Sequence, residues 1–366
     1  MKKKLLNFLF LWPMALAVTS CLDDDSLAED NTYVGNFEAC WTAMDEHYCF
    51  FDEKGVNWDS VYDVYRPMFR DSVKSNFEAF NLMANMLASV RDGHVNLYSS
   101  FNTARYWAWF EDYPQNFDAT LVERYYLGTS YWMTSGMIYG MFKDTVAYMR
   151  YGSFASSVGE TNLDYVLALL RNAKGLIIDV RDNGGGTLTN VNTLANRFCT
   201  EKTIFGYIKH KTGKGHSDFS EPEELYLEPQ KNRVNWDAST QPVVVLTNRS
   251  CYSATNCFVS AMKSLDGLMT TDSIGQRHPK IIKTIGDRTG GGGGMPFETV
   301  LPNGWIVRFS ACPMFDAWQK SIEEGIDPDI HVDMDSASAY FNHTDDIIEA
   351  ARAYIKKNTR VKGGKK

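Results

Sequence analysis

The sequence lacks the residue patterns of common metal and nucleotide sites. None of its seven cysteines forms a C-x-x-C pair, and none of its seven histidines belongs to an H-E-x-x-H motif. The glycine run at residues 290–294 is not followed by the Lys-Ser or Lys-Thr of a phosphate-binding loop. We therefore expect neither a metal nor a cofactor. The cysteines in apolar surroundings are interpreted as core residues: Cys40, Cys251, Cys257 and Cys312.

Basic surface is equally scarce. Lysine and arginine together number 37 against 45 acidic residues, which gives a formal net charge of −8. Dense basic clusters occur only at the two ends of the chain, so nucleic acid is not an expected partner. With 44% hydrophobic and 13% aromatic residues, the 366-residue chain can build a full core in one large or two modest domains.

Long apolar runs are absent except at the N-terminus. There, three lysines precede an apolar run that is too short to cross a membrane and that ends in small residues before Cys21. This pattern predicts a signal peptide at residues 1–20 and an acidic tether at residues 21–33. The junction resembles a bacterial lipobox, which implies an outer-membrane lipoprotein of a Gram-negative cell envelope, anchored through a lipid on Cys21. The acidic tether resembles a surface-export signal, which implies exposure outside the cell. An ordinary signal peptide with an incidental cysteine is the alternative.

Apolar spacing divides the rest of the chain. Apolar stripes at helical spacing predict a helical subdomain at residues 34–100, including a capping box at Ser75 and Glu78. An aromatic-rich connecting segment follows at residues 101–136. From residue 137 to 335, short apolar runs alternate with helical ones, which predicts a layered α/β core. Residues 336–366 are expected to form a C-terminal helix and a basic tail.

Within the core, the polar stretch at residues 201–237 is expected to be an excursion over the surface. Strands are predicted at residues 137–142, 146–151, 176–180, 243–247, 267–271 and 305–309, and helices at residues 162–172, 188–199, 253–265 and 345–356.

Two segments of the core carry residues that could form a nucleophile and an anion-binding loop. Residues 175–186 form a buried-type strand that leads into three glycines, whose backbone amides can approach an anion closely. A second apolar run ends in Ser253 and Ala254, where a helical pattern begins. A serine at a strand-to-helix turn indicates acyl transfer through a serine nucleophile, with the amides of Gly185 and Ala254 as oxyanion donors. A simple N-cap is the alternative role for this serine.

Several further segments follow one another along the chain with these two: Asp92-Gly93-His94, residues 175–186 and 247–256, Ile-Gly-Asp-Arg-Thr followed by five glycines at 285–294, and Gly-Ile-Asp-Pro-Asp-Ile at 325–330. Their order resembles that found in the C-terminal processing and tricorn-core serine peptidases. The chain resembles this family over about residues 34–335. The resemblance implies a ClpP-like or crotonase-like core of stacked ββα units that cleaves peptide bonds through Ser253. An inserted PDZ domain is not evident, because only about forty residues separate His94 from the first core strand.

The resemblance also implies a base and an orienting acid. The processing-peptidase branch uses a lysine in a glycine loop, but Gly292 stands at that position here. The tricorn-like branch uses a histidine from the helical part, and His94 matches it; a neutral imidazole is a competent base. That branch also has a glutamate shortly before its Gly-x-x-Pro-Asp motif, and this glutamate orients the histidine. The resemblance therefore implies Glu323, which lies one residue closer to Gly325 than is usual, with Glu324 as the alternative. Asn256 is a further departure, since many members carry glutamate there.

Two functional hypotheses follow. The first is a serine endopeptidase of the cell envelope that acts on peptides or unfolded proteins through Ser253, His94 and Glu323. The second is an inactive relative that binds peptides, glycans or lipophilic molecules. This hypothesis is motivated by two departures from the family pattern, Asn256 and the position of Glu323, and by the aromatic connecting segment.

Overall fold

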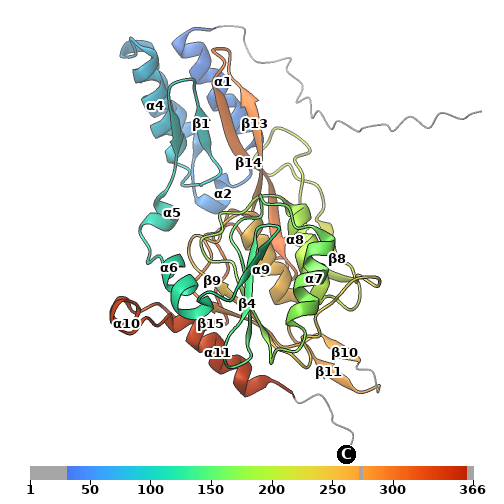
Figure 1. Ribbon diagram of the computed structural model, residues 1–366. Helices are drawn as coiled ribbons and strands as arrows, with labels where there is room; N and C mark the ends of the chain where they lie inside the picture. The colour runs from blue at the N-terminus through green and yellow to red at the C-terminus, as the bar shows by residue number, and fades with distance from the viewer. Residues whose placement is uncertain (1–30, 272–274, 361–366) are drawn as a thin grey trace, which may run out of the picture.

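The computed structural model of the protein describes residues 31–271 and 275–360 (Figure 1). The predicted signal peptide, Cys21, most of the acidic tether and the end of the basic tail lie outside these residues. Within the described ranges, none of the helices has both the length and the apolar character needed to cross a membrane. The N-terminal helices gather at one end of the molecule, and the strand-rich core forms the other (Figure 1).

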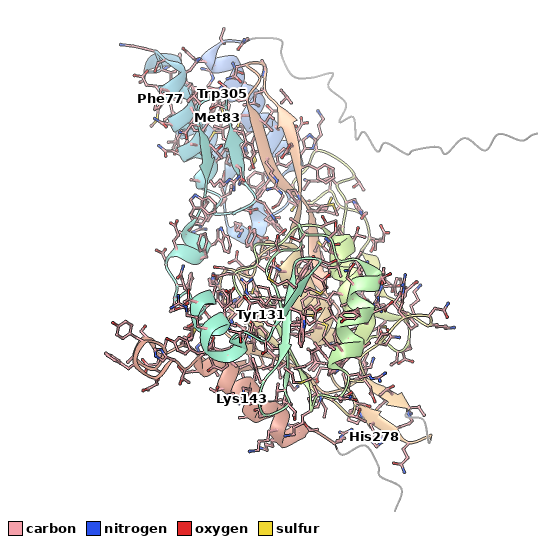
Figure 2. All side chains as sticks on the ribbon, viewed as in Figure 1. Phe77, Met83, Tyr131, Lys143, His278 and Trp305 are labelled. Atoms are coloured by element: carbon pink, nitrogen blue, oxygen red, sulfur yellow. The ribbon has the colours of Figure 1, made fainter. Side chains whose placement is uncertain are left out.

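The N-terminal region is built from α1 (Tyr33–His47), α2 (Phe51–Lys54), α3 (Trp58–Asp71) and α4 (Asn76–Ala88). The side chains of Thr32, Asn57 and Ser75 accept N–H groups in the first turns of α1, α3 and α4, which fixes where these helices begin. Their apolar faces pack with the β-strands beside them, and Met83 and Trp305 of this cluster are labelled in Figure 2.

An antiparallel sheet joins the helical region to the core. Its order is β2 (Thr103–Arg105), β1 (Asn96–Tyr98), β14 (Ile306–Asp316), β7 (Thr203–Ile208) and β8 (Glu223–Leu227), with β13 (Gly294–Val300) also paired to β14. β14 pairs with β1 over residues 306–308 and with β13 over residues 306–313, whereas residues 314–316 pair with β7. The long strand β14 therefore connects the helical region to the core.

The core sheet has seven strands. Their order is β15 (Ile330–His331), β12 (Ile282–Gly286), β9 (Val243–Thr247), β6 (Leu176–Asp179), β5 (Ala147–Tyr151), β4 (Met137–Met141) and β3 (Trp132–Thr134). The strands from β15 to β5 run parallel, and β4 and β3 are antiparallel to their neighbours.

Helices cover both faces of this sheet. One face packs against α7 (Glu160–Leu170), α8 (Leu188–Ala195) and α9 (Ala254–Leu265), and the other packs against α11 (Asp346–Asn358). Val243 and Val245 of β9 face the first layer, while Val244 and Leu246 face the second. Burial on both faces explains why β9 is a continuous apolar run in the sequence.

The remaining described elements are short: α5 (Ala108–Glu111), α6 (Ala119–Leu121), η1 (Val122–Leu127), η2 (Asn196–Phe198), β10 (Met269–Thr271), β11 (Arg277–Pro279) and α10 (Ser336–Asn342).

The predicted mixed α/β class with a helical N-terminal region is confirmed, but one detail of the core is wrong. Residues 201–237 are not simply a surface excursion, because they contain β7 and β8. Both strands are partly exposed, so their sequence is more polar than that of the central strands. The five glycines at residues 290–294 are buried and lead into β13. The four cysteines predicted to lie in the core are buried.

Candidate active site

Ser253 lies between β9 and α9, at the carboxyl edge of the core sheet. Its backbone has φ 58° and ψ −121°, a conformation that is unfavourable for a residue with a Cβ atom. The Ser253 N–H donates to the Gly291 carbonyl at 2.8 Å, which holds this turn in place. The serine side chain makes no capping hydrogen bond to α9. The simple N-cap role is therefore not what this geometry provides.

Gly185, in the loop after β6, lies directly against Ser253. A Cβ atom at Gly185 would stand 2.9 Å from the Ser253 Cβ and 3.0 Å from the Ala254 nitrogen, and its φ is +101°. The glycine loop and the start of α9 thus converge, as an oxyanion site requires. The Gly185 N–H itself donates to Asn183 Oδ1 at 3.0 Å. In this structure, that amide is engaged within its own loop.

His94 lies buried in the turn between α4 and β1. Its ring packs edge-on against Tyr252 with the ring centroids 4.9 Å apart, so it reaches the residue immediately before Ser253. The His94 Nδ1 atom is buried without a hydrogen-bond partner. Among the residues that the structure describes, no hydrogen bond joins this ring nitrogen to the Ser253 hydroxyl.

The surroundings of His94 favour its neutral form. Burial lowers the pKa of His94 to about 4; Asp92 and a backbone hydrogen bond at Gly294 oppose this shift, and Arg308 adds to it. The imidazole is therefore neutral at pH 7, which is the form that a general base needs.

Asp92 anchors the turn that carries His94. Its Oδ1 atom accepts the His94 backbone N–H at 2.7 Å and the Tyr252 hydroxyl at 3.3 Å. Its Oδ2 atom accepts the Ser310 hydroxyl at 2.8 Å. This carboxylate, which is buried, connects the His94 turn to the neighbour of Ser253 and to β14.

Glu323 is buried after the end of β14, whereas Glu324 is exposed. Glu323 Oε2 accepts the Gly293 N–H at 2.8 Å, and Oε1 lies 2.9 Å from the Lys54 ammonium. Burial raises the pKa of Glu323 well above its ordinary value, with Asp92 adding to the rise and Lys54 opposing it. No described hydrogen bond joins Glu323 to the His94 ring.

Aromatic rings cover the glycines of the site. Trp109 of α5 stacks on Tyr252 with ring centroids 4.1 Å apart. A Cβ atom at Gly93 would stand 2.6 Å from Trp109 Nε1, and one at Gly292 would stand 2.5 Å from the Tyr252 ring. Gly292 has φ +75°. The Tyr252 ring thus occupies the space that a side chain at position 292 would need, which explains why no lysine stands there.

Asn256 lies buried in the first turn of α9. Its Nδ2 atom donates to the Ile322 carbonyl at 2.7 Å, and its Oδ1 atom accepts the Thr289 hydroxyl at 2.6 Å. Asn256 thus ties α9 to the segment before the glycine run and to the residue before Glu323. Where many family members carry a glutamate, this chain has a neutral amide that both donates and accepts a hydrogen bond.

Comparisons with known proteins identify the family and the fold. The family model for peptidase family S41 matches residues 145–332, and the model for the tricorn protease C1 domain matches residues 30–88. A candidate peptidase from Parabacteroides merdae ATCC 43184 is 46% identical, with 89% of this chain and 97% of that chain covered and a TM-score of 0.80. No match was found among curated proteins.

Two more distant structures share the fold. Mature CPAF in complex with lactacystin is 11% identical, with 89% of this chain and 98% of that chain covered and a TM-score of 0.62. The tricorn protease is 15% identical, with 89% of this chain and 37% of that chain covered and a TM-score of 0.51. The fold and these matches together define the class of the protein, an α/β peptidase. The chain belongs to peptidase family S41.

The structure brings Ser253, Gly185 and Ala254 together and places His94 against Tyr252. Sequence reasoning did not single out Tyr252 or Lys54. Tyr252 had one signal, its position directly before Ser253. No sequence signal pointed to Lys54, because it is far from Glu323 in the sequence and the two residues meet only in the folded protein.

Proposed function

We propose that this peptidase is a serine endopeptidase with Ser253 as the nucleophile and His94 as the general base. The observation that supports this most is the backbone of Ser253, held at φ 58° beside Gly185 and Ala254. Such a conformation costs about 1–3 kcal/mol, and residues of this kind cluster at active sites. The N-terminus of α9 favours negative charge at the same point.

The chemistry needs the His94 ring to come within hydrogen-bond reach of the Ser253 hydroxyl when substrate binds; catalytic hydrogen bonds are often long in free enzymes and tighten in the substrate complex. His94 Nδ1 takes the proton of the Ser253 hydroxyl as its oxygen attacks the scissile carbonyl carbon. The oxyanion accepts the Ala254 N–H, and it accepts the Gly185 N–H once that amide leaves Asn183. The imidazolium then protonates the departing amine, and water hydrolyses the acyl-enzyme with His94 again as base.

Hydrolysis of unfolded casein tests this proposal. Ser253→Ala and His94→Ala are each expected to lower the rate by about a thousandfold or more. Ser260→Ala is a matched control, because this serine lies buried in the same helix but away from the turn. It is expected to keep the wild-type rate. Casein cleavage by the Ser253→Ala protein at the wild-type rate would refute the proposal.

A second candidate function is peptide binding without cleavage. It is favoured by the engaged Gly185 amide and by the missing hydrogen bond between Ser253 and His94. Failure of a serine-directed phosphonate to label the protein, together with retained binding of unfolded casein, would favour this candidate.

We further propose that the peptidase works in the cell envelope, anchored through a lipid on Cys21. The pattern of the first 21 residues supports this location. In a Gram-negative host, Cys21→Ser is expected to move the protein from the membrane fraction to the soluble fraction. Unchanged fractionation of Cys21→Ser would contradict the anchor.

A further inference from the structure

Lys54, the last residue of α2, is a buried lysine with acidic partners. Its ammonium lies 2.9 Å from Glu323 Oε1 and 2.7 Å from Glu324 Oε1, and its side chain is 7% exposed. Burial lowers the pKa of Lys54, but the charges of Glu323 and Asp92 outweigh burial and raise it above its ordinary value. Lys54 therefore remains a cation inside the protein.

The carboxylates around Lys54 hold the parts that surround His94. Asp92 binds the His94 backbone N–H and the Tyr252 hydroxyl, and Glu323 binds the Gly293 N–H. Both Tyr252 and the residue after Gly293 touch the His94 ring. The position of the imidazole thus depends on Glu323, which is ion-paired with the Lys54 ammonium, and on Asp92, whose charge acts on the same ammonium.

Two other ionisable groups face the same carboxylates, and neither is a cation. Tyr48 and Cys49 both face Asp92 and Glu323, and burial together with these charges raises the pKa of both groups well above their ordinary values. Both remain neutral. Without Lys54, two buried carboxylates would repel each other, or one of them would take up a proton.

We propose that Lys54 is a positioning residue of the peptidase site, whose ammonium balances Asp92 and Glu323 so that the His94 turn and the glycine run keep their places beside Ser253. This inference rests on the proposed serine mechanism. Lys54 lies outside the substrate's reach in this account, so it acts on kcat rather than on KM.

A double-mutant cycle tests the proposal. Lys54→Met leaves the two buried carboxylates, Asp92 and Glu323, without a cation. Lys54→Met with Glu323→Gln leaves one buried carboxylate unopposed, the same imbalance among the buried groups as in the wild type. We expect Lys54→Met to lower kcat about tenfold or more with KM within about twofold of wild type. The double variant is expected to have a higher kcat than Lys54→Met, well above the product of the two single effects.

Two controls accompany the cycle. Lys214→Met removes another lysine that is paired with a glutamate, but one that is 70% exposed, and it is expected to match the wild type. Thermal unfolding of each variant shows that it is folded at the assay temperature. Should Lys54→Met not fold, a double variant that folds and hydrolyses casein still supports the charge balance.

A second measurement separates positioning from packing. The rate at which a phosphonate labels Ser253 is measured against pH. The fall of this rate at low pH, the acid limb of the profile, reports the pKa of His94. Because Lys54→Met leaves more negative charge near the ring, this limb is expected to move up by about one pH unit. The proposal is overturned by a Lys54→Met protein with wild-type kcat and an unmoved acid limb, or by strictly additive effects in the double variant. A wild-type protein as inactive as Ser253→Ala would instead overturn the serine mechanism itself.

Discussion

Lowering the pH from 7 to 4 should destabilise this protein through His94. The ordinary pKa of histidine is 6.5, whereas burial lowers that of His94 to about 4. Between these values the unfolded chain binds a proton that the folded chain does not, so the free energy of unfolding falls as the pH falls through this window. A difference of this size corresponds to about 3 kcal/mol.

Urea unfolding of the wild type and of His94→Asn at several pH values measures this contribution. Carboxylates titrate in both proteins, so the difference between the two curves isolates His94. We expect the wild type to lose about 3 kcal/mol more than the variant between pH 7 and pH 4. If the free energies of unfolding of the two proteins changed in parallel with pH, the folded protein would not hold His94 as a buried neutral imidazole. The same shift predicts that casein hydrolysis persists from pH 7 down to about pH 5, well below the ordinary histidine pKa.

Two further substitutions test the geometry around Ser253. Ser253→Gly relieves the strained φ and is expected to raise the free energy of unfolding by about 1 kcal/mol relative to Ser253→Ala in urea titrations; an equal or lower value would mean that the turn is not strained. Gly185→Ala would place a Cβ atom 2.6 Å from the Tyr252 carbonyl oxygen and is expected to abolish phosphonate labelling, whereas Gly184→Ala, which has open space around it, should keep labelling. Equal labelling of the two alanine variants would contradict the close contact between Gly185 and the turn at Ser253.

The fold could be predicted where burial imposes a strong pattern. The strand β9 was located at its observed residues because both of its faces are covered, which requires a continuous apolar run. Strands β7 and β8 were missed because their partial exposure brings polar residues into them. Short-range sequence patterns do not distinguish such strands from polar loops.

The site was predictable only in part. Ser253 and the glycine loop each follow a strand of one parallel sheet, so their convergence follows from the topology. The pairing of Lys54 with Glu323 joins residues that are far apart in the sequence, and neither residue type is unusual at a protein surface. Their burial becomes visible only when the end of α2 meets the segment that follows β14.

The most direct test of the account is to identify the residue that a peptidyl phosphonate modifies, by mass spectrometry of the intact protein and its fragments. We predict one adduct on Ser253 in the wild type, formed at a strongly reduced rate in His94→Ala and absent in Ser253→Ala. An adduct on another residue, or labelling of Ser253 at the same rate without His94, would contradict the proposed nucleophile and base.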